Sequence, residues 1–147
     1  MKKNPFYKKY TSDKKMQNKY ANYQEKYREN PKESDKLSVD LIKEKIKNKK
    51  AFELLDIACS TGNFLKFLKL QIPDAKLTGV DLAPNIIENC KNDKKLSGIK
   101  FFKADVTSLN LNKKFDIITA NAVTYLLGKD DYLKALRSIY NSLKNGG

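Results

Sequence analysis

The chain has 147 residues, of which 40% are hydrophobic, 32% are charged and none is histidine. This length and composition suit one folded domain and argue against wholesale disorder. The missing histidine excludes mechanisms with a histidine base, and two cysteines are too few for a zinc site built from Cys and His.

The charge of the chain is positive and uneven. It carries 30 basic against 17 acidic side chains, a formal net charge of +13, and all the basic residues except Arg28 and Arg137 are lysine. Arginine is the residue favoured for bidentate contacts to phosphate and guanine. Residues 1–50 carry 16 basic and 7 acidic side chains, so most of the excess lies at the N-terminus. We therefore do not expect nucleic acid as the main partner.

The cysteines and the N-terminus indicate a compartment. Cys59 and Cys90 allow at most one disulfide, and we expect both to be free thiols. No apolar segment follows the N-terminal lysines as in a signal peptide, and no apolar run approaches the roughly 20 residues of a membrane helix. We expect a cytoplasmic protein without a bound metal or a membrane partner.

Residues 1–36 form a basic arm that is rich in lysine and tyrosine. Its tyrosines are Tyr7, Tyr10, Tyr20, Tyr23 and Tyr27. Glycine is absent and apolar aliphatic residues are almost absent, so the arm cannot form a core alone, although helical turns can form around 13–29. Two interpretations stay open: a solvated extension, or a lid that folds over the body with its tyrosines inward.

Residues 37–147 are predicted to form the folded domain. Short apolar runs alternate with helical periodicity after the arm. The predicted strands are 52–58, 76–80, 99–103 and 115–120; the predicted helices are 35–49, 62–71, one that begins at Pro84, and 130–144. This alternation predicts an α/β fold with a doubly wound, Rossmann-like parallel sheet. Such sheets bind ligands beyond the carboxyl ends of their strands.

Small residues follow the first predicted strand. Ala58, Ser60 and Gly62 alternate along this loop, and Cys59 lies between the first two. Small residues let a backbone approach a ligand, and Gly62 opens a helix whose first N–H groups are free. Tight packing of a strand against a helix is the structural alternative.

Polar residues lie at the ends of the same strands. Asp56 lies in the first strand, Asp81 ends the second, Asp105 follows the third and Asn121 follows the fourth. A carboxylate at the position of Asp81 can accept hydrogen bonds from ribose hydroxyls. Asp105 could bind an exocyclic amine while the next N–H, that of Val106, binds a ring nitrogen. Each residue could instead cap a helix or a turn, but together they surround one nucleoside.

With these motifs the chain resembles the class I S-adenosylmethionine-dependent methyltransferases. The resemblance covers about residues 52–147, and four family motifs occur in order at 54–63, 77–82, 102–106 and 115–123. Residues 143–147 resemble the turn that leads into the fifth strand of that family. The resemblance implies S-adenosyl-L-methionine as cofactor.

The resemblance also implies a role for each site residue. Asp56 and the loop residues Ala58, Cys59, Ser60 and Gly62 would hold the methionine end of the cofactor. Asp81 would bind the ribose, Leu82 would pack on the adenine, and Asp105 and the Val106 N–H would bind its edge. Asn121 would lie near the methyl-transfer site. Tyr125 matches a position beside the acceptor pocket, but we favour a place in the core.

The chain departs from the family pattern in two respects. Ala58 and Ser60 replace the usual glycines, so the loop path could differ slightly. Only four of the seven family strands are predicted, so the domain looks incomplete after the fourth strand. We therefore expect that self-association or a partner chain covers an exposed sheet edge.

The implied reaction is methyl transfer to a small-molecule or sugar acceptor. Positioning and desolvation would be the main contributions of the protein, and no catalytic residue is assigned. Alternatives are an RNA-binding methyltransferase that uses the basic arm, and an inactive cofactor-binding fragment. A nicotinamide-dependent oxidoreductase would need Gly-x-Gly-x-x-Gly directly after the strand, and residues 58–63 do not contain it.

Overall fold

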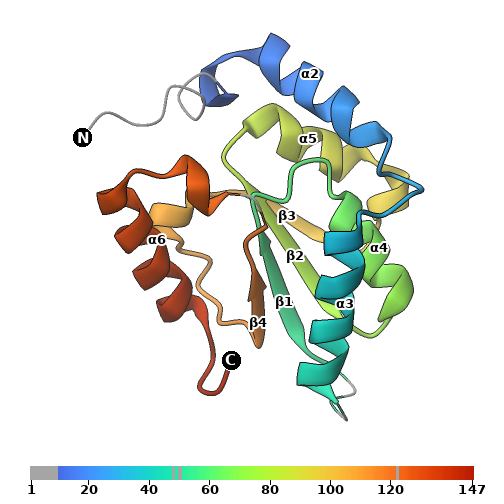
Figure 1. Ribbon diagram of the computed structural model, residues 1–147, viewed down its shortest axis with the longest axis vertical. Coiled ribbons are helices and arrows are strands. Elements are labelled where there is room, and N and C mark those ends of the chain that lie inside the picture. Colours follow the sequence, from blue (N-terminus) through green and yellow to red (C-terminus); the bar gives the residue numbers. More distant parts are fainter. Residues whose placement is uncertain (1–9, 48, 50, 122) are drawn as a thin grey trace.

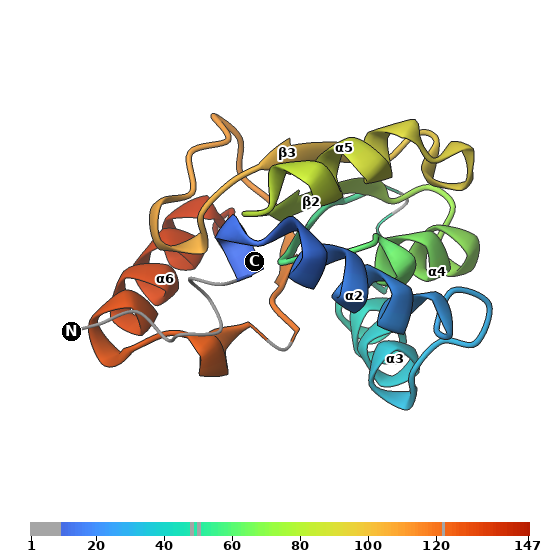
Figure 2. The ribbon, with the colours of Figure 1, turned by 90° about the horizontal axis from the view of Figure 1, so that it is seen from above.

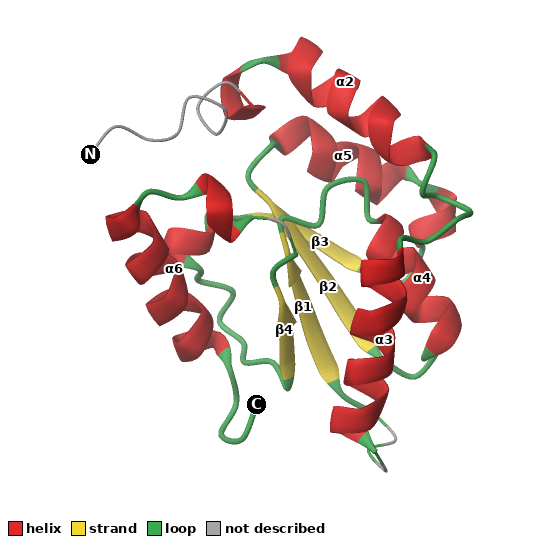
Figure 3. Ribbon diagram, viewed as in Figure 1, coloured by secondary structure: helices red, strands yellow, loops and turns green. Residues whose placement is uncertain are grey.

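Four parallel strands form a single sheet in the order β3-β2-β1-β4 (Figures 1 and 3). The structure is a computed structural model, and it describes residues 10–47, 49, 51–121 and 123–147. The strands are β1 (Glu53–Ile57), β2 (Lys76–Asp81), β3 (Lys100–Lys103) and β4 (Ile117–Thr119). This confirms the predicted parallel sheet. In the register of the sheet, Asp56 of β1 lies between Gly79 of β2 and Thr119 of β4.

Helices cover both faces of the sheet. One core contains buried residues of α3 (Glu33–Ile46), α4 (Asn63–Gln71) and α5 (Pro84–Asn92). The second core lies around Phe115 and Ala135, which belongs to α6 (Lys129–Ser142). The body also contains short 3-10 turns: η1 (Lys94–Leu96), η2 (Val106–Ser108) and η3 (Thr124–Leu126).

Alternate residues of β1 face the two cores, as the period of a strand requires. Leu54 packs into the core with α3, α4 and α5, and Leu55 packs into the core with α6. The helix α4 packs closely on β2: a Cβ atom on Gly79 would stand 2.7 Å from the Leu65 side chain. The absence of a side chain at Gly79 therefore allows this close packing.

The apolar side chains of two helices are only partly buried. On α3, Val39 and Ile42 are buried, whereas Leu37 and Leu41 are exposed. On α6, Ala135 is buried, whereas Leu133, Leu136 and Tyr140 are among its exposed residues. The strand β4 is the last strand on this side of the sheet, so within the described chain no further strand covers these side chains.

The described part of the arm is folded onto the body. Its helix α2 (Lys14–Glu25) begins at Asp13, whose carboxylate accepts a hydrogen bond from the Met16 N–H at 3.1 Å. Seen from above, α2 crosses the carboxyl edge of the sheet between α5 and α3 (Figure 2). The buried Gln17 donates to the Tyr10 carbonyl at 2.8 Å and accepts from Asn85 at 3.1 Å.

The described part of the arm packs on the body with some of its tyrosines turned inward, and its role as a lid stays a prediction. Tyr10 and Tyr20 are partly buried, whereas Tyr23 is exposed. Tyr7 lies outside the described residues. No helix in the described part of the chain is long and apolar enough to span a bilayer.

Candidate functional site

Three adjoining cavities lie at the carboxyl edge of the sheet, between the strand ends and the arm. We call them the apolar, middle and acidic cavities, with volumes of about 60, 70 and 110 Å³. All three share Ala58 in their lining. The middle cavity also shares Tyr10 and Asp81 with the apolar cavity, and Tyr20 and Asn121 with the acidic cavity, so the three form one row. The apolar cavity is lined by Tyr10, Thr11, Ile57, Ala58, Asp81, Leu82, Ala104, Val106, Val123 and Leu126. The middle cavity is lined by Tyr10, Tyr20, Ala58, Ser60, Asp81, Asn121, Val123, Tyr125 and Leu126. The acidic cavity is lined by Tyr20, Gln24, Lys32, Ser34, Asp35, Asp56, Ala58, Cys59, Ser60, Thr61, Asn63, Phe64 and Asn121.

The loop 58–62 turns sharply below these cavities. Ala58, Ser60 and Gly62 all have positive φ angles, of 56°, 48° and 74°. This is the left-handed region that favours glycine, so Ala58 and Ser60 hold a backbone suited to the residue they replace. At Gly62 a Cβ atom would also stand 2.9 Å from the Leu96 side chain. Gly62 caps α4, whose first N–H groups therefore face the loop.

Asp81 ties the loop to the end of β2. Its Oδ2 accepts a hydrogen bond from the Ser60 N–H at 3.1 Å, and its Oδ1 accepts one from the Ala83 N–H at 2.9 Å. Burial raises the pKa of this carboxyl, and the hydrogen bonds from backbone N–H groups oppose that rise. Asp81 thus acts as a structural cap and also lines the apolar and middle cavities.

Asp56 is buried to the same extent as Asp81, but its carboxylate contacts a side-chain hydroxyl instead of backbone N–H groups. It is 4% exposed, and its Oδ1 accepts a hydrogen bond from the Thr119 hydroxyl at 2.7 Å. Burial raises the pKa of Asp56 to about 7, with smaller contributions from the charges of Asp35 and Asp81, and the Thr119 hydrogen bond opposes the rise. A cation in the acidic cavity would favour the charged form of this carboxylate.

Of the remaining predicted residues, some line a cavity and one does not. Leu82 and Val106 line the apolar cavity, and Asn121 lines the middle and acidic cavities. Asp105 does not line any of the three; its Oδ1 accepts hydrogen bonds from the Thr107 N–H and hydroxyl, at 2.9 and 2.8 Å, and caps η2. The preference for Tyr125 in the core was wrong, because this side chain is 72% exposed at the mouth of the middle cavity.

Sequence reasoning missed several lining residues, and four of them carry a polar or charged group from the N-terminal part of the chain. Tyr10 and Tyr20 reach the cavities from the arm, and Lys32 and Asp35 reach the acidic cavity from the start of α3. The tyrosine content of the arm gave a signal for the first two. Lys32 and Asp35 lie in a stretch of ordinary charged residues, where no motif distinguishes them.

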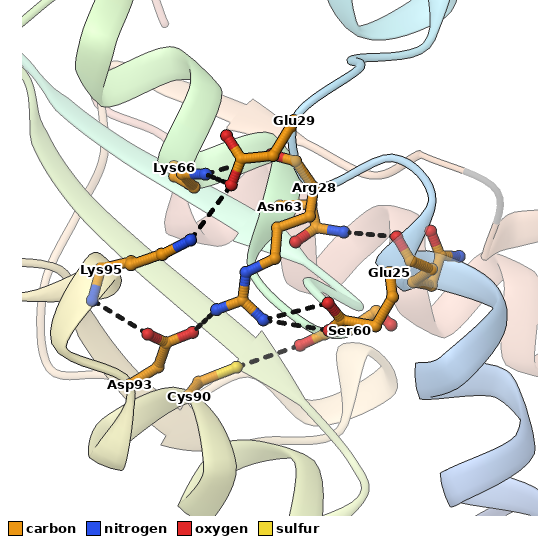
Figure 4. A network of polar contacts seen from close by, with 10 residues as sticks. Glu25, Arg28, Glu29, Ser60, Asn63, Lys66, Cys90, Asp93 and Lys95 are labelled. Carbon is orange, nitrogen blue, oxygen red and sulfur yellow. Dashed lines mark hydrogen bonds and ion pairs between the residues drawn. The ribbon is translucent and has the colours of Figure 1, made fainter.

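A polar network fastens the end of α2 and the following turn to α4, α5 and η1 (Figure 4). Arg28 pairs with Asp93 and with Glu25, and Glu29 pairs with Lys66 at 2.7 Å and Lys95 at 3.2 Å. In the same network Asn63 donates to the Gln24 carbonyl at 2.8 Å, and the Cys90 thiol donates to the Ser60 carbonyl at 3.2 Å. This network holds the arm over the row of cavities.

The two cysteines are buried free thiols, as predicted. A hydrogen bond with the Cys90 thiol and burial raise the pKa of Cys59 well above its usual value, so it is suited to packing rather than to nucleophilic chemistry. Among the described residues, no group of three or more cysteine or acidic side chains is arranged to hold a metal ion.

The chain matches known proteins over most of its length. A family model described as a methyltransferase domain matches residues 54–147. A malonyl-[acyl-carrier protein] O-methyltransferase of Acetivibrio thermocellus is 30% identical over 102 residues, which cover 69% of this chain and 35% of the relative.

Two solved structures show the same fold. One is the plantazolicin methyltransferase BpumL in complex with a pentazolic desmethylPZN analog and SAH, with a TM-score of 0.75 at 21% identity. The match covers 97% of this chain and 55% of the BpumL chain. The amino pentose methyltransferase CalS10 from Micromonospora echinaspora, with SAM bound, has a TM-score of 0.67 at 24% identity, over 83% of this chain and 51% of its own. The chain spans about a third to a half of the lengths of these three relatives.

Proposed function

The chain belongs to the methyltransferase-domain family, whose model matches residues 54–147, and from this premise we propose that it binds S-adenosyl-L-methionine and transfers the methyl group to a small-molecule or sugar acceptor. The observation that carries the proposal is the row of three cavities, which differ in polarity along one sheet edge. This cofactor has an aromatic base, a ribose and a charged amino-acid end in the same order.

The residues present fit each part of the cofactor. Leu82 and Val106 give the apolar cavity the character that an adenine ring needs, and Asp81 lines its boundary with the middle cavity, where ribose hydroxyls could donate to it. The hydroxyl oxygen of Ser60 is buried without a hydrogen-bond partner among the described residues. A buried hydroxyl of this kind favours a polar ligand at the loop.

The protein would act mainly by positioning. When bound, the cofactor supplies a methyl group on a sulfonium that is already activated for in-line displacement. Tyr10 and Tyr20 of the arm would exclude water from the cofactor, and Asn121 would orient groups at the middle cavity. Tyr125 stands at the open side of that cavity, where an acceptor could enter. We assign no catalytic base.

Calorimetric titration with S-adenosylhomocysteine and with NAD tests the cofactor proposal. We expect S-adenosylhomocysteine to bind at one site and NAD not to bind. Asp81→Ala should weaken S-adenosylhomocysteine at least tenfold, because it removes the acceptor for the ribose. Asp74→Ala, an exposed change on the loop before β2, is the matched control and should have no effect. Tight NAD binding without S-adenosylhomocysteine binding would contradict the proposal.

The acceptor proposal has a separate test. The relatives named above include an amino pentose methyltransferase and a methyltransferase for malonyl-[acyl-carrier protein], which supports a small-molecule or sugar acceptor without selecting one. Transfer of a labelled methyl group from the cofactor into cell extracts, followed by fractionation, would identify the product. Label that enters only RNA would favour the alternative in which the basic arm binds nucleic acid.

The arm itself gives little support to that alternative. The exposed ring of Tyr23 packs against the partly buried Tyr27 ring with centroids 5.7 Å apart, and Lys26 lies 4.0 Å above the Tyr23 ring. These rings and this ammonium group therefore already satisfy one another. Proteins that bind single-stranded nucleic acid instead present aromatic rings on which bases stack.

A further inference from the structure

We propose that Asp35 and Lys32, at the start of α3, recognise the amino-acid head group of the cofactor: Asp35, together with Asp56, binds the α-ammonium group, and Lys32 binds the α-carboxylate. This inference rests on the proposed function and adds to it two residues outside the motifs. It makes the junction between the arm and the body part of the cofactor site, and it assigns selectivity for an intact amino-acid end to that junction.

The first support is the placement of two carboxylates at one cavity. Asp56 at the end of β1 and Asp35 in the first turn of α3 both line the acidic cavity, and they are 4% and 9% exposed. Like charges in such a place raise the free energy of the folded chain unless a cation lies between them or one of them is protonated. The α-ammonium group of the cofactor would supply such a cation.

The protein itself does little to stabilise the charged form of Asp35. Its Oδ2 accepts one long hydrogen bond, of 3.4 Å, from the Lys32 N–H. Burial raises the pKa of Asp35, and that hydrogen bond and the Lys32 charge oppose the rise. The charge of Asp35 in turn helps to raise the pKa of Asp56. An ammonium group in the cavity would stabilise the charged forms of both carboxylates.

The second support is the position of the Lys32 ammonium group. It donates to the Gln24 side chain at 3.2 Å and lies 4.5 Å from the centre of the Tyr27 ring. No carboxylate of the described residues lies within ion-pair distance of it, although Lys32 lines the same cavity as Asp35 and Asp56. A cavity lined by one lysine and two carboxylates matches a zwitterion, since each end of the ligand finds a residue of opposite charge.

The third support is independent of these charges. The hydroxyl oxygen of Ser60, whose residue lines the acidic and middle cavities, is buried without a hydrogen-bond partner among the described residues. A buried hydroxyl without a partner, on a residue that both cavities share, favours a polar ligand beside it. The acidic cavity is therefore a place for a polar ligand, not only a cluster of acids.

Three adenosyl ligands separate the two contacts in a binding assay. S-adenosylhomocysteine carries both charges of the head group, decarboxylated S-adenosylmethionine lacks the carboxylate, and 5′-methylthioadenosine lacks the whole head group. Isothermal titration calorimetry of each ligand with the 147-residue chain gives dissociation constants without a need for turnover.

Asp35→Asn should weaken S-adenosylhomocysteine at least tenfold and leave 5′-methylthioadenosine within twofold. Lys32→Met should weaken S-adenosylhomocysteine about tenfold and leave decarboxylated S-adenosylmethionine within twofold, and Lys32→Arg should restore most of the loss. The matched controls are Glu33→Gln and Lys36→Met, an exposed ion pair on the same helix turn. Both controls should bind all three ligands as the unchanged chain does.

Asparagine can still accept the Lys32 N–H, and circular dichroism with thermal unfolding would show that Asp35→Asn retains the fold. Equal weakening of all three ligands by Asp35→Asn or Lys32→Met would indicate a structural role and overturn the inference. Unchanged S-adenosylhomocysteine binding in both variants would overturn it as well. If the unchanged chain binds none of the three ligands, the proposed function itself fails, which is a different result.

Discussion

At the scale of single residues, Ala58 and Ser60 hold backbone angles that are unfavourable for them. Their φ angles of 56° and 48° lie in the left-handed region, where an L side chain costs roughly 1–2 kcal/mol. Ala58→Gly should therefore stabilise the chain by about 1 kcal/mol in urea unfolding. Gly62→Ala should destabilise it, since Gly62 has a φ of 74° and lacks room for a Cβ atom. A loss of stability in Ala58→Gly would show that the loop is not held in this conformation.

The buried carboxyl of Asp56 makes stability depend on pH. Its pKa is raised from 3.8 to about 7, so between these values the folded chain keeps a proton that the unfolded chain releases. The stabilisation from this group is complete below about pH 3.8 and is lost as the pH rises towards 7. Asp56→Asn should therefore reduce the fall in unfolding free energy between pH 4.5 and 7.5, measured by urea unfolding without ligand. The buried carboxyls of Asp35 and Asp81 act in the same direction and remain in the variant. An unchanged pH profile would contradict the assignment.

The residues that sequence alone could identify are those at strand ends. Asp56, Asp81 and the loop 58–62 could be predicted, because the end of a parallel strand is a local pattern with a known place in the fold. Lys32 and Asp35 could not, because they reach the acidic cavity only through the packing of α3 and the arm onto the body. Asp105 also follows a strand, and its side chain caps η2 without lining the three cavities; its contact with the cofactor stays a prediction.

At the scale of elements, α2 and the turn after it form a strap over the cavities. Lys66 of α4 holds this strap through Glu29 at 2.7 Å and through the Arg28 carbonyl at 3.1 Å (Figure 4). Lys66→Met should speed hydrogen exchange in α2 by about twofold to fivefold, because contacts of this kind contribute modestly. Lys43→Met, an exposed change on α3, is the control. Saturating S-adenosylhomocysteine should slow exchange in both variants, and equal exchange in the two without ligand would contradict the role of Lys66.

The order and type of the elements could be predicted from the sequence, but which side chains of each helix are buried could not. Strands could be recognised as short apolar runs between helical stretches, and β1, β2 and β3 begin or end within one residue of the predicted limits. Periodicity marked an apolar stripe on α3 and on α6 without showing what would cover it. Burial depends on the neighbours of a helix, and Leu41 and Leu136 lack such neighbours in the described chain.

At the scale of the whole molecule, apolar surface gathers beside β4. A groove of about 310 Å³ runs between α3 and β4, lined by Ser38, Leu41, Ile42, Lys45, Ile117, Ile118, Thr119, Leu143 and Gly147. The strand β4 is also an edge of the sheet, and exposed edges with apolar neighbours tend to pair with other chains. We therefore predict that the 147-residue chain self-associates through this groove.

Light scattering over a range of protein concentrations tests this surface. Leu41→Lys, at a residue that is 57% exposed in the groove, should shift the population towards the monomer. Leu70→Lys, at a residue of α4 that is 69% exposed outside the groove, is the matched control and should change nothing. A monomer at every concentration, or equal association of the two variants, would contradict the prediction.

The central claim is that one adenosyl cofactor occupies the three cavities in a fixed direction. A crystal structure of the chain with S-adenosylhomocysteine tests it most directly. The predicted result has the adenine against Leu82 and Val106, the ribose hydroxyls on Asp81, and the amino-acid end in the acidic cavity. Electron density for the ligand in the reverse direction, or at another place on the molecule, would contradict it.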